Sequence, residues 1–158
     1  LNIINNTIPY YKRIQKIFVN FSVNDDRFNQ KKKSLNIIPR DLLIIDKDIL
    51  PRTIFWEKAK NYTFVLTPSC SGLDSHKIWE ALCLGCIPII CVPEFKKLFE
   101  DLPVLIVNEW NEITPELLHQ TVEAFKSRVF NYKKLTLKYW LNLINNQDLI
   151  YTSPKKEQ

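Results

Sequence analysis

Apolar residues in this chain fall in short, nearly continuous runs that are separated by polar segments. Runs of this kind, rich in Ile, Val, Leu and Phe and closed by polar residues or proline, are typical of strands buried on both faces. The predicted strands are residues 16–22, 42–45, 62–67, 87–92 and 104–107. Strands without an alternating pattern indicate a parallel sheet that is covered by helices on both sides.

Helix boundary residues lie between these runs. Pro51 and Pro115 occupy places where proline opens the first helical turn. Asp74 or Ser75 is expected to cap a helix that ends near Gly85, a residue that tolerates the left-handed conformation found after helices. The predicted helices are residues 52–60, 75–84, 95–101, 114–130 and 132–146.

The alternation of strand and helix predicts the fold class. It indicates an α/β, Rossmann-like domain with a parallel sheet between two helical layers. We expect this domain to cover residues 16–148, after an irregular or linker segment at 1–15 and before a mobile tail at 149–158. Within the domain, a loop is expected after the strand 16–22, and the segment 24–34 is polar and charged.

Composition restricts the class of protein further. With 158 residues, 46% of them hydrophobic and 25% charged, the chain has the size and balance of one globular domain. No apolar run reaches the roughly 18–20 residues that span a bilayer, so we expect no membrane segment. The net charge of +5 suits an anionic small ligand or nucleic acid. The lysines at 31–33 and the basic helices at 126–138 are interpreted as solvated faces, because their aromatic residues have helix-core spacing, and no nucleic-acid partner is expected.

The four cysteines are clustered between residues 70 and 91. They are Cys70, Cys83, Cys86 and Cys91. Cys83 and Cys86 form a C-x-x-C pair, but no second pair or nearby histidine completes a zinc set, and the pair closes a helix rather than opening one. We therefore expect buried free thiols, with a disulfide or a metal site as alternatives. Reduced thiols favour a cytoplasmic location. Because the chain begins at Leu1, we leave open an upstream targeting or anchor segment.

The segment after the strand 62–67 carries the candidate chemistry. In open parallel sheets, ligands bind beyond the carboxyl ends of strands, where loops lead into helices. The small, polar loop 68–74 follows the carboxyl end of a predicted strand and leads into a helix. The first N–H groups of that helix and its positive dipole end are available to an anion. His76 and Lys77 lie in its first turn, where helix design alone favours an acid. Glu80 lies on the same flank, one turn further on, as an acceptor for ribose hydroxyls. The alternative is an exposed helical Lys77–Glu80 ion pair.

Several of these segments resemble exostosin-type glycosyltransferases and their relatives of the GT-B fold. The stretches that carry the resemblance are residues 64–68, 72–82, 84–89 and 101–107. Within them a strand and small-residue loop lead into a helix with a basic residue, then Glu-Ala, then Gly-Cys-x-Pro-Ile. Residues 19–22 with Arg27 are similar to the first strand and loop of the same half. The resemblance covers about residues 16–113 and implies the C-terminal, nucleotide-sugar-binding half of such an enzyme.

The resemblance also implies a role for each position. Lys77 stands where the family usually has the diphosphate-binding Arg, and Glu80 stands where it has the ribose-binding Glu. The other residues expected near the diphosphate are Ser69, Ser71, Gly72, Arg27 and His76. The implied activity is transfer of a sugar from a UDP- or GDP-linked donor to a glycan or protein acceptor, without a cofactor or metal. The acceptor half of the fold would be a missing N-terminal domain.

The acidic pair, the two histidines and the function itself each have another interpretation. Asp46 and Asp48 follow a predicted strand as Asp-x-Asp, which in the GT-A fold holds Mg²⁺ or Mn²⁺, but we expect a solvated strand end here. His119 has no sequence partner and is interpreted as a surface histidine, whereas His76 serves the helix start or contacts the ligand. A non-catalytic nucleotide-sugar-binding or assembly module is the alternative function.

Overall fold

The computed structural model describes residues 8–23, 29–68 and 75–151, with side chains described up to Asn145. A five-stranded sheet forms its centre, and every strand pair in it is parallel. The strands are β1 (Ile14–Val19), β2 (Leu43–Ile45), β3 (Tyr62–Leu66), β4 (Ile87–Ile90) and β5 (Leu105–Ile106), arranged in the order β2-β1-β3-β4-β5. The predicted α/β, Rossmann-like parallel sheet is therefore confirmed.

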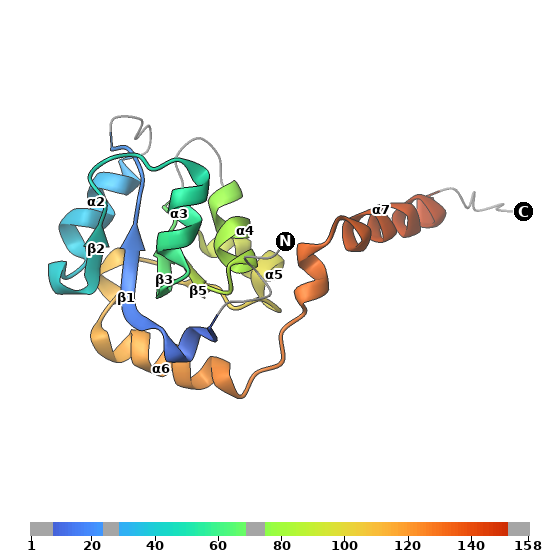
Figure 1. Cartoon of the computed structure of the whole chain (residues 1–158). Coiled ribbons are helices and arrows are strands. Elements are labelled where there is room, and N and C mark those ends of the chain that lie inside the picture. The colour runs from blue at the N-terminus through green and yellow to red at the C-terminus, as the bar shows by residue number, and fades with distance from the viewer. Residues whose placement is uncertain (1–7, 24–28, 69–74, 152–158) are drawn as a thin grey trace, which may run out of the picture.

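Helices cover both faces of the sheet (Figure 1). They are α2 (Gln30–Ile37), α3 (Arg52–Ala59), α4 (His76–Cys83), α5 (Lys96–Phe99), α6 (Pro115–Lys126) and α7 (Leu137–Tyr151). Short 3₁₀ turns add η1 (Tyr10–Lys12), η2 (Arg40–Leu42), η3 (Pro93–Phe95), η4 (Trp110–Glu112) and η5 (Tyr132–Leu135). Helix α7 extends away from the rest of the domain (Figure 1). None of the helices in the described part of the chain is long and apolar enough to cross a membrane.

Alternate residues of the strands supply the two halves of the core. Phe64 on β3 belongs to the cluster that includes Leu118 and Val122 of α6. The next residue, Val65, packs instead with Phe55 of α3 and with α4. Because successive side chains of a strand point to opposite faces, a continuous apolar run is what burial between two helical layers requires.

Both ends of α4 agree with the residues that predict them. Ser75, rather than Asp74, is the N-cap, and its hydroxyl accepts a hydrogen bond from the Lys77 N–H at 3.3 Å. Gly85 follows the helix with φ of 70°, the left-handed region in which a side chain would be strained.

The sequence predicts no helix in the polar segment 24–34, but α2 begins within it at Gln30. Only the far end of α2 carries apolar side chains toward the core, including Leu35, so the segment has little helical periodicity in the sequence. Other boundaries shift as well. β1 starts at Ile14 rather than residue 16, α6 ends at Lys126 rather than 130, and the predicted helix 132–146 is η5 followed by α7.

Candidate functional site

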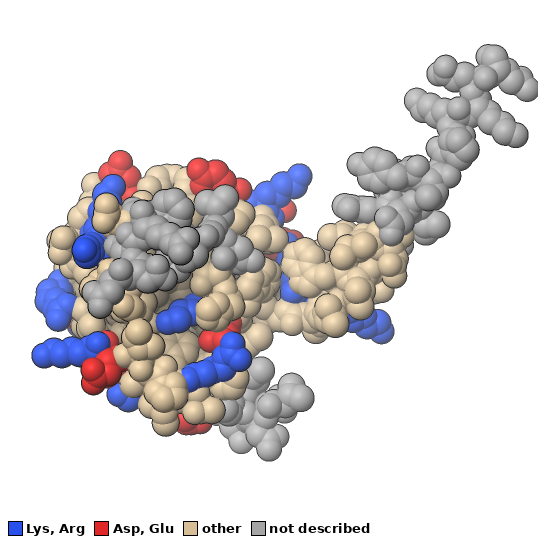
Figure 2. All heavy atoms as spheres, turned by 90° about the horizontal axis from the view of Figure 1, so that it is seen from above, with Lys and Arg blue, Asp and Glu red and all other residues tan. Residues whose placement is uncertain are grey.

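A small cavity lies between the ends of two neighbouring strands whose following helices cover opposite faces of the sheet. β1 and β3 are neighbours, but β1 leads to α2 on one face of the sheet and β3 leads to α4 on the other. Such a topological switch point is where open α/β sheets bind ligands. The cavity has a volume of about 150 Å³ and is lined by Phe21, Ser22, Lys31, Ile49, Leu66, Thr67, Pro68, Ser75, His76 and Lys77. Figure 2 looks down on the face of the domain at this edge, and Lys and Arg residues are interspersed there with Asp and Glu.

Lys77 directs its charge from α4 toward the end of β1. Its ammonium group donates a hydrogen bond of 2.5 Å to the carbonyl oxygen of Asn20, directly after β1. The same nitrogen lies 5.3 Å from the centre of the Phe55 ring on α3. The sequence suggests an exposed first-turn lysine, but the side chain is half-buried because β1 and α3 supply an acceptor and an aromatic face.

Lys31 brings a second ammonium group to the cavity from the opposite helical layer. It is buried on α2, and its nitrogen lies 5.9 Å from the centre of the Phe21 ring. The sequence predicts a solvated face for all three lysines of this run, which is confirmed for the exposed Lys32 and Lys33 and is wrong for the buried Lys31. Helical spacing indicates the burial of Lys31, because Ser34 and Leu35, which face the core, follow it by three and four residues on the same side of a helix.

The start of α4 completes the described wall of the cavity. Ser75, His76 and Lys77 line it, and His76 is exposed to solvent. The first N–H groups of an eight-residue helix have no partners within the helix and carry its positive dipole. Two lysines and a helix start thus surround one small cavity, which is an arrangement that attracts an anion.

Glu80 lies one turn further along α4 and faces α3 instead of the cavity. One carboxylate oxygen forms an ion pair of 2.8 Å with Arg52, and the other accepts a hydrogen bond of 3.3 Å from the Trp56 indole N–H. The Glu80 side chain is 15% exposed and that of Arg52 is 63% exposed. Glu80 is not among the described residues that line the cavity. The structure therefore brings Lys77 and His76 together there and holds Glu80 beside them.

Four predicted site residues lie outside the described part of the chain: Ser69, Ser71, Gly72 and Arg27. The residues that flank the loop 69–74, Pro68 and Ser75, both line the cavity.

The acidic pair and the cysteines have other surroundings. Asp46 forms an ion pair of 2.9 Å with Lys58 of α3, and the carbonyl oxygen of Asp48 accepts from the side-chain amide of Asn20. Within the described ranges, no group of three or more His, Cys, Asp or Glu is placed to hold a metal. Cys83, Cys86 and Cys91 are free thiols, of which Cys86 is buried and the others are half-buried, while Cys70 lies outside the described residues. His119 is exposed on α6.

The site is a small cavity at a topological switch point, and two lysines and the start of α4 line it. The chain matches no family model, and it has no significant sequence match among curated proteins.

Proposed function

We propose that the switch-point cavity binds the diphosphate of a nucleotide sugar and that the chain acts as a glycosyltransferase or as the donor-binding domain of one. The observation that supports this most is the convergence of Lys31 and Lys77 on one cavity at the start of α4. These two lysines come from helices on opposite faces of the sheet. Positive charge from two directions suits a diphosphate, which carries charge on both phosphoryl groups.

The size of the cavity limits what it holds. Small-molecule pockets commonly measure about 300–1,000 Å³, whereas this cavity measures about 150 Å³. It therefore suits the diphosphate alone, with the nucleoside and the sugar extending from its mouth. His76 lines the cavity and is exposed to solvent, so we expect it to contact one of these extensions.

Glu80 supplies the acceptor that a ribose needs. It follows His76 by four residues, which is about 6 Å along a helix axis and close to the spacing between a phosphate and its ribose. Its present partners are Trp56 and the largely exposed Arg52. Because the Arg52 side chain is 63% exposed, it can turn into solvent and leave its place on Glu80 to ribose hydroxyls.

In the proposed reaction, the bond between the anomeric carbon and the diphosphate oxygen breaks and the sugar passes to an acceptor hydroxyl. Negative charge grows on the departing diphosphate, and the two ammonium groups and the α4 dipole stabilise it. The proposed donors are UDP- or GDP-linked sugars, and the acceptor is a glycan or a protein. The base that activates the acceptor, and the acceptor domain itself, are not assigned to any residue of this chain.

Calorimetry with UDP, GDP and inorganic pyrophosphate tests the binding step. At 100 times the Kd, a ligand that binds only the folded state adds about 2.7 kcal/mol to the free energy of unfolding. Lys31→Ala is expected to weaken pyrophosphate binding, whereas Lys33→Ala, on the exposed side of the same helix, serves as the matched control. If millimolar UDP, GDP and their sugars release no heat and shift no melting temperature, the proposal is wrong.

Release of nucleotide from the sugar donors separates the two versions of the proposal. Turnover that rises when glycan or protein acceptors are added supports a transferase. Tight binding of the donor without turnover on any acceptor supports the non-catalytic binding module instead.

A further inference from the structure

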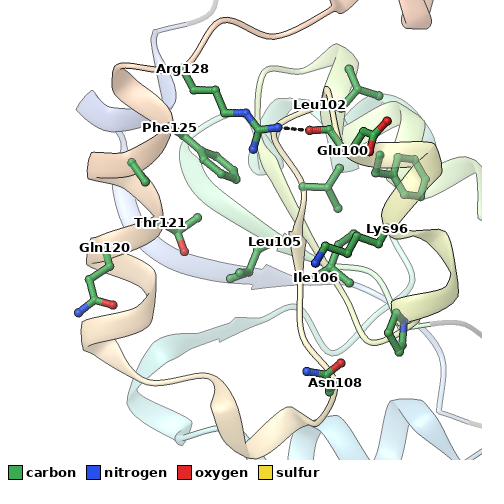
Figure 3. Close-up of a pocket in the computed structure, with 14 residues that line it drawn as sticks. Lys96, Glu100, Leu102, Leu105, Ile106, Asn108, Gln120, Thr121, Phe125 and Arg128 are labelled. Carbon is green, nitrogen blue, oxygen red and sulfur yellow. Dashed lines mark hydrogen bonds between the residues drawn. The ribbon is translucent and has the colours of Figure 1, made fainter.

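A second and larger groove runs along the open edge of the sheet. β5 pairs with β4 on one side, and on its other side a groove of about 500 Å³ lies between α5 and α6. Figure 3 shows Phe125 of α6 and Lys96 of α5 pointing toward this space, whereas Gln120 points away from it. The groove has the volume of a ligand-binding pocket and a mainly apolar lining that includes Leu102, Leu105 and Phe125.

The backbone of β5 presents unused hydrogen-bonding groups to this groove. The Val107 N–H donates to the Ile90 carbonyl oxygen at 3.0 Å, and Ile106 is the residue in register with Ile90. Since neighbouring residues of a strand turn their amide groups to opposite sides, the N–H and C=O of Ile106 point away from β4 into the groove. No described residue outside the sheet bonds to them. An extended backbone satisfies both groups at once, which a small apolar ligand does not.

The walls of the groove define the side chains that such a backbone needs. Residues of α5 line one wall and residues of α6, including Phe125, line the other, so an added strand would be covered on both faces, like β3 and β4. A strand in that position requires a continuous apolar run rather than an alternating one.

The charges at the groove favour an acidic occupant. Lys96 lines it, and among the described residues no carboxylate pairs with its ammonium group. Arg128 also lines the groove, and it donates to the backbone carbonyl of Glu100 rather than to a carboxylate (Figure 3). Two cations against the single carboxylate of Glu100 leave the lining positive.

We propose that this groove binds an extended, apolar segment with an acidic side chain from a partner polypeptide, which adds to β5 as a sixth strand. The main-chain groups of Ile106 set its position, Phe125 and the other lining side chains of α5 and α6 cover its faces, and Lys96 pairs with its carboxylate. β4 separates this edge from β3 and from the switch-point cavity, so the site is independent of the proposed donor site.

Selection from a phage-displayed library of random nine-residue peptides tests the proposal. The intact chain is the target, and Ala124→Trp is the counter-target, because Ala124 is exposed on α6 and lines the groove, so the larger ring fills it without entering the core. We expect enriched peptides with a central apolar run and an Asp or Glu, and at least about tenfold weaker binding to the Trp variant. An absence of enriched sequences, basic enriched sequences, or equal binding to both targets would overturn the proposal.

Three further variants test the roles of the backbone and of the charge. Ile106→Pro removes the outward N–H and keeps the Val107 bond to β4, so binding should fall about tenfold while the melting transition stays cooperative. Lys96→Glu should weaken binding of the acidic peptides, whereas Lys97→Glu, beside it on α5 and outside the groove, should have little effect. Unchanged binding to Ile106→Pro, or dimerisation of the chain that Ala124→Trp abolishes, would contradict a partner strand. UDP binding should be the same in all four variants.

Discussion

The ammonium group of Lys77 lies 2.5 Å from the carbonyl oxygen of Asn20, so the first turn of α4 is bonded to the carboxyl end of β1. These two residues are 57 positions apart. The bond fixes the cation at the rim of the switch-point cavity, against the Phe55 ring, before any ligand arrives. A charge that is already in place loses little side-chain entropy when it binds an anion.

Replacing Lys77 should therefore affect both stability and binding. Lys77→Met keeps the aliphatic chain over Phe55 but removes the hydrogen bond to Asn20, which is expected to cost about 1 kcal/mol of unfolding free energy because the site is half-buried. Pyrophosphate affinity should fall about tenfold. Urea unfolding and calorimetry measure the two effects, with Lys77→Arg as the variant that retains the charge. Normal pyrophosphate binding by Lys77→Met would assign the lysine a purely structural role.

Glu80 should distinguish nucleotides from inorganic anions. Glu80→Gln keeps the size of the side chain but leaves one acceptor oxygen where the carboxylate has two. UDP, which has two ribose hydroxyls to donate, should therefore bind several-fold more weakly, and pyrophosphate binding should not change. Because the Trp56 indole donates to Glu80, UDP should also change the tryptophan fluorescence of the wild-type chain. Trp56→Phe is the control that removes this signal. Equal losses for UDP and pyrophosphate would place Glu80 outside the ribose site.

The sequence predicts the elements of this fold better than their contacts. Continuous apolar runs such as residues 87–92 predict strands between two helical layers, and the structure has β4 within that run. Ser75 and Gly85 are identified because capping and left-handed turns depend on local chemistry. Helix α2 is missed because its first turn consists of polar residues, which are also typical of loops.

The contacts of the candidate site depend on residues that are distant in the sequence. Helical spacing indicates that Lys77 and Glu80 share a flank of α4. It does not indicate that Lys77 contacts Asn20 after β1 or that Glu80 contacts Arg52 of α3, because those contacts form only when the elements pack together. The burial of Lys31 follows from the docking of α2 on the sheet. Such contacts are tertiary, so propensity and periodicity do not predict them.

Arg13 should be one of the most sensitive positions for stability. It is buried, no carboxylate in the described part of the chain pairs with it, and its guanidinium donates to the carbonyl oxygens of Ile8 and Leu84 and to the sulfur of Cys86. Arg13→Met leaves these acceptors without a donor, so we expect a loss of about 3 kcal/mol in urea unfolding. The matched control is Arg40→Met, at an exposed position, which should change stability by less than about 0.5 kcal/mol. Similar losses in both variants would mean that Arg13 contributes no more than a surface arginine.

Cys86 should make the fold sensitive to alkaline pH. Burial raises the pKa of its thiol from 9.0 to about 11, although the neighbouring Arg13 acts in the opposite direction. The thiol also donates to the carbonyl oxygen of Ala59, a contact that a thiolate would lose. Between pH 9 and 11 the folded state therefore holds a proton that the unfolded state has released.

Stability should accordingly be complete below pH 9 and should decrease as the pH rises toward 11, by about 3 kcal/mol at most. Urea unfolding of the wild type and of Cys86→Ala at several pH values measures this effect. Other groups titrate in both proteins, so the difference between the two slopes isolates the thiol. The alanine variant should be less stable than the wild type below pH 9, and the gap should narrow above it. Parallel stability curves from pH 8 to 11 would mean that the Cys86 thiol titrates at its ordinary pKa.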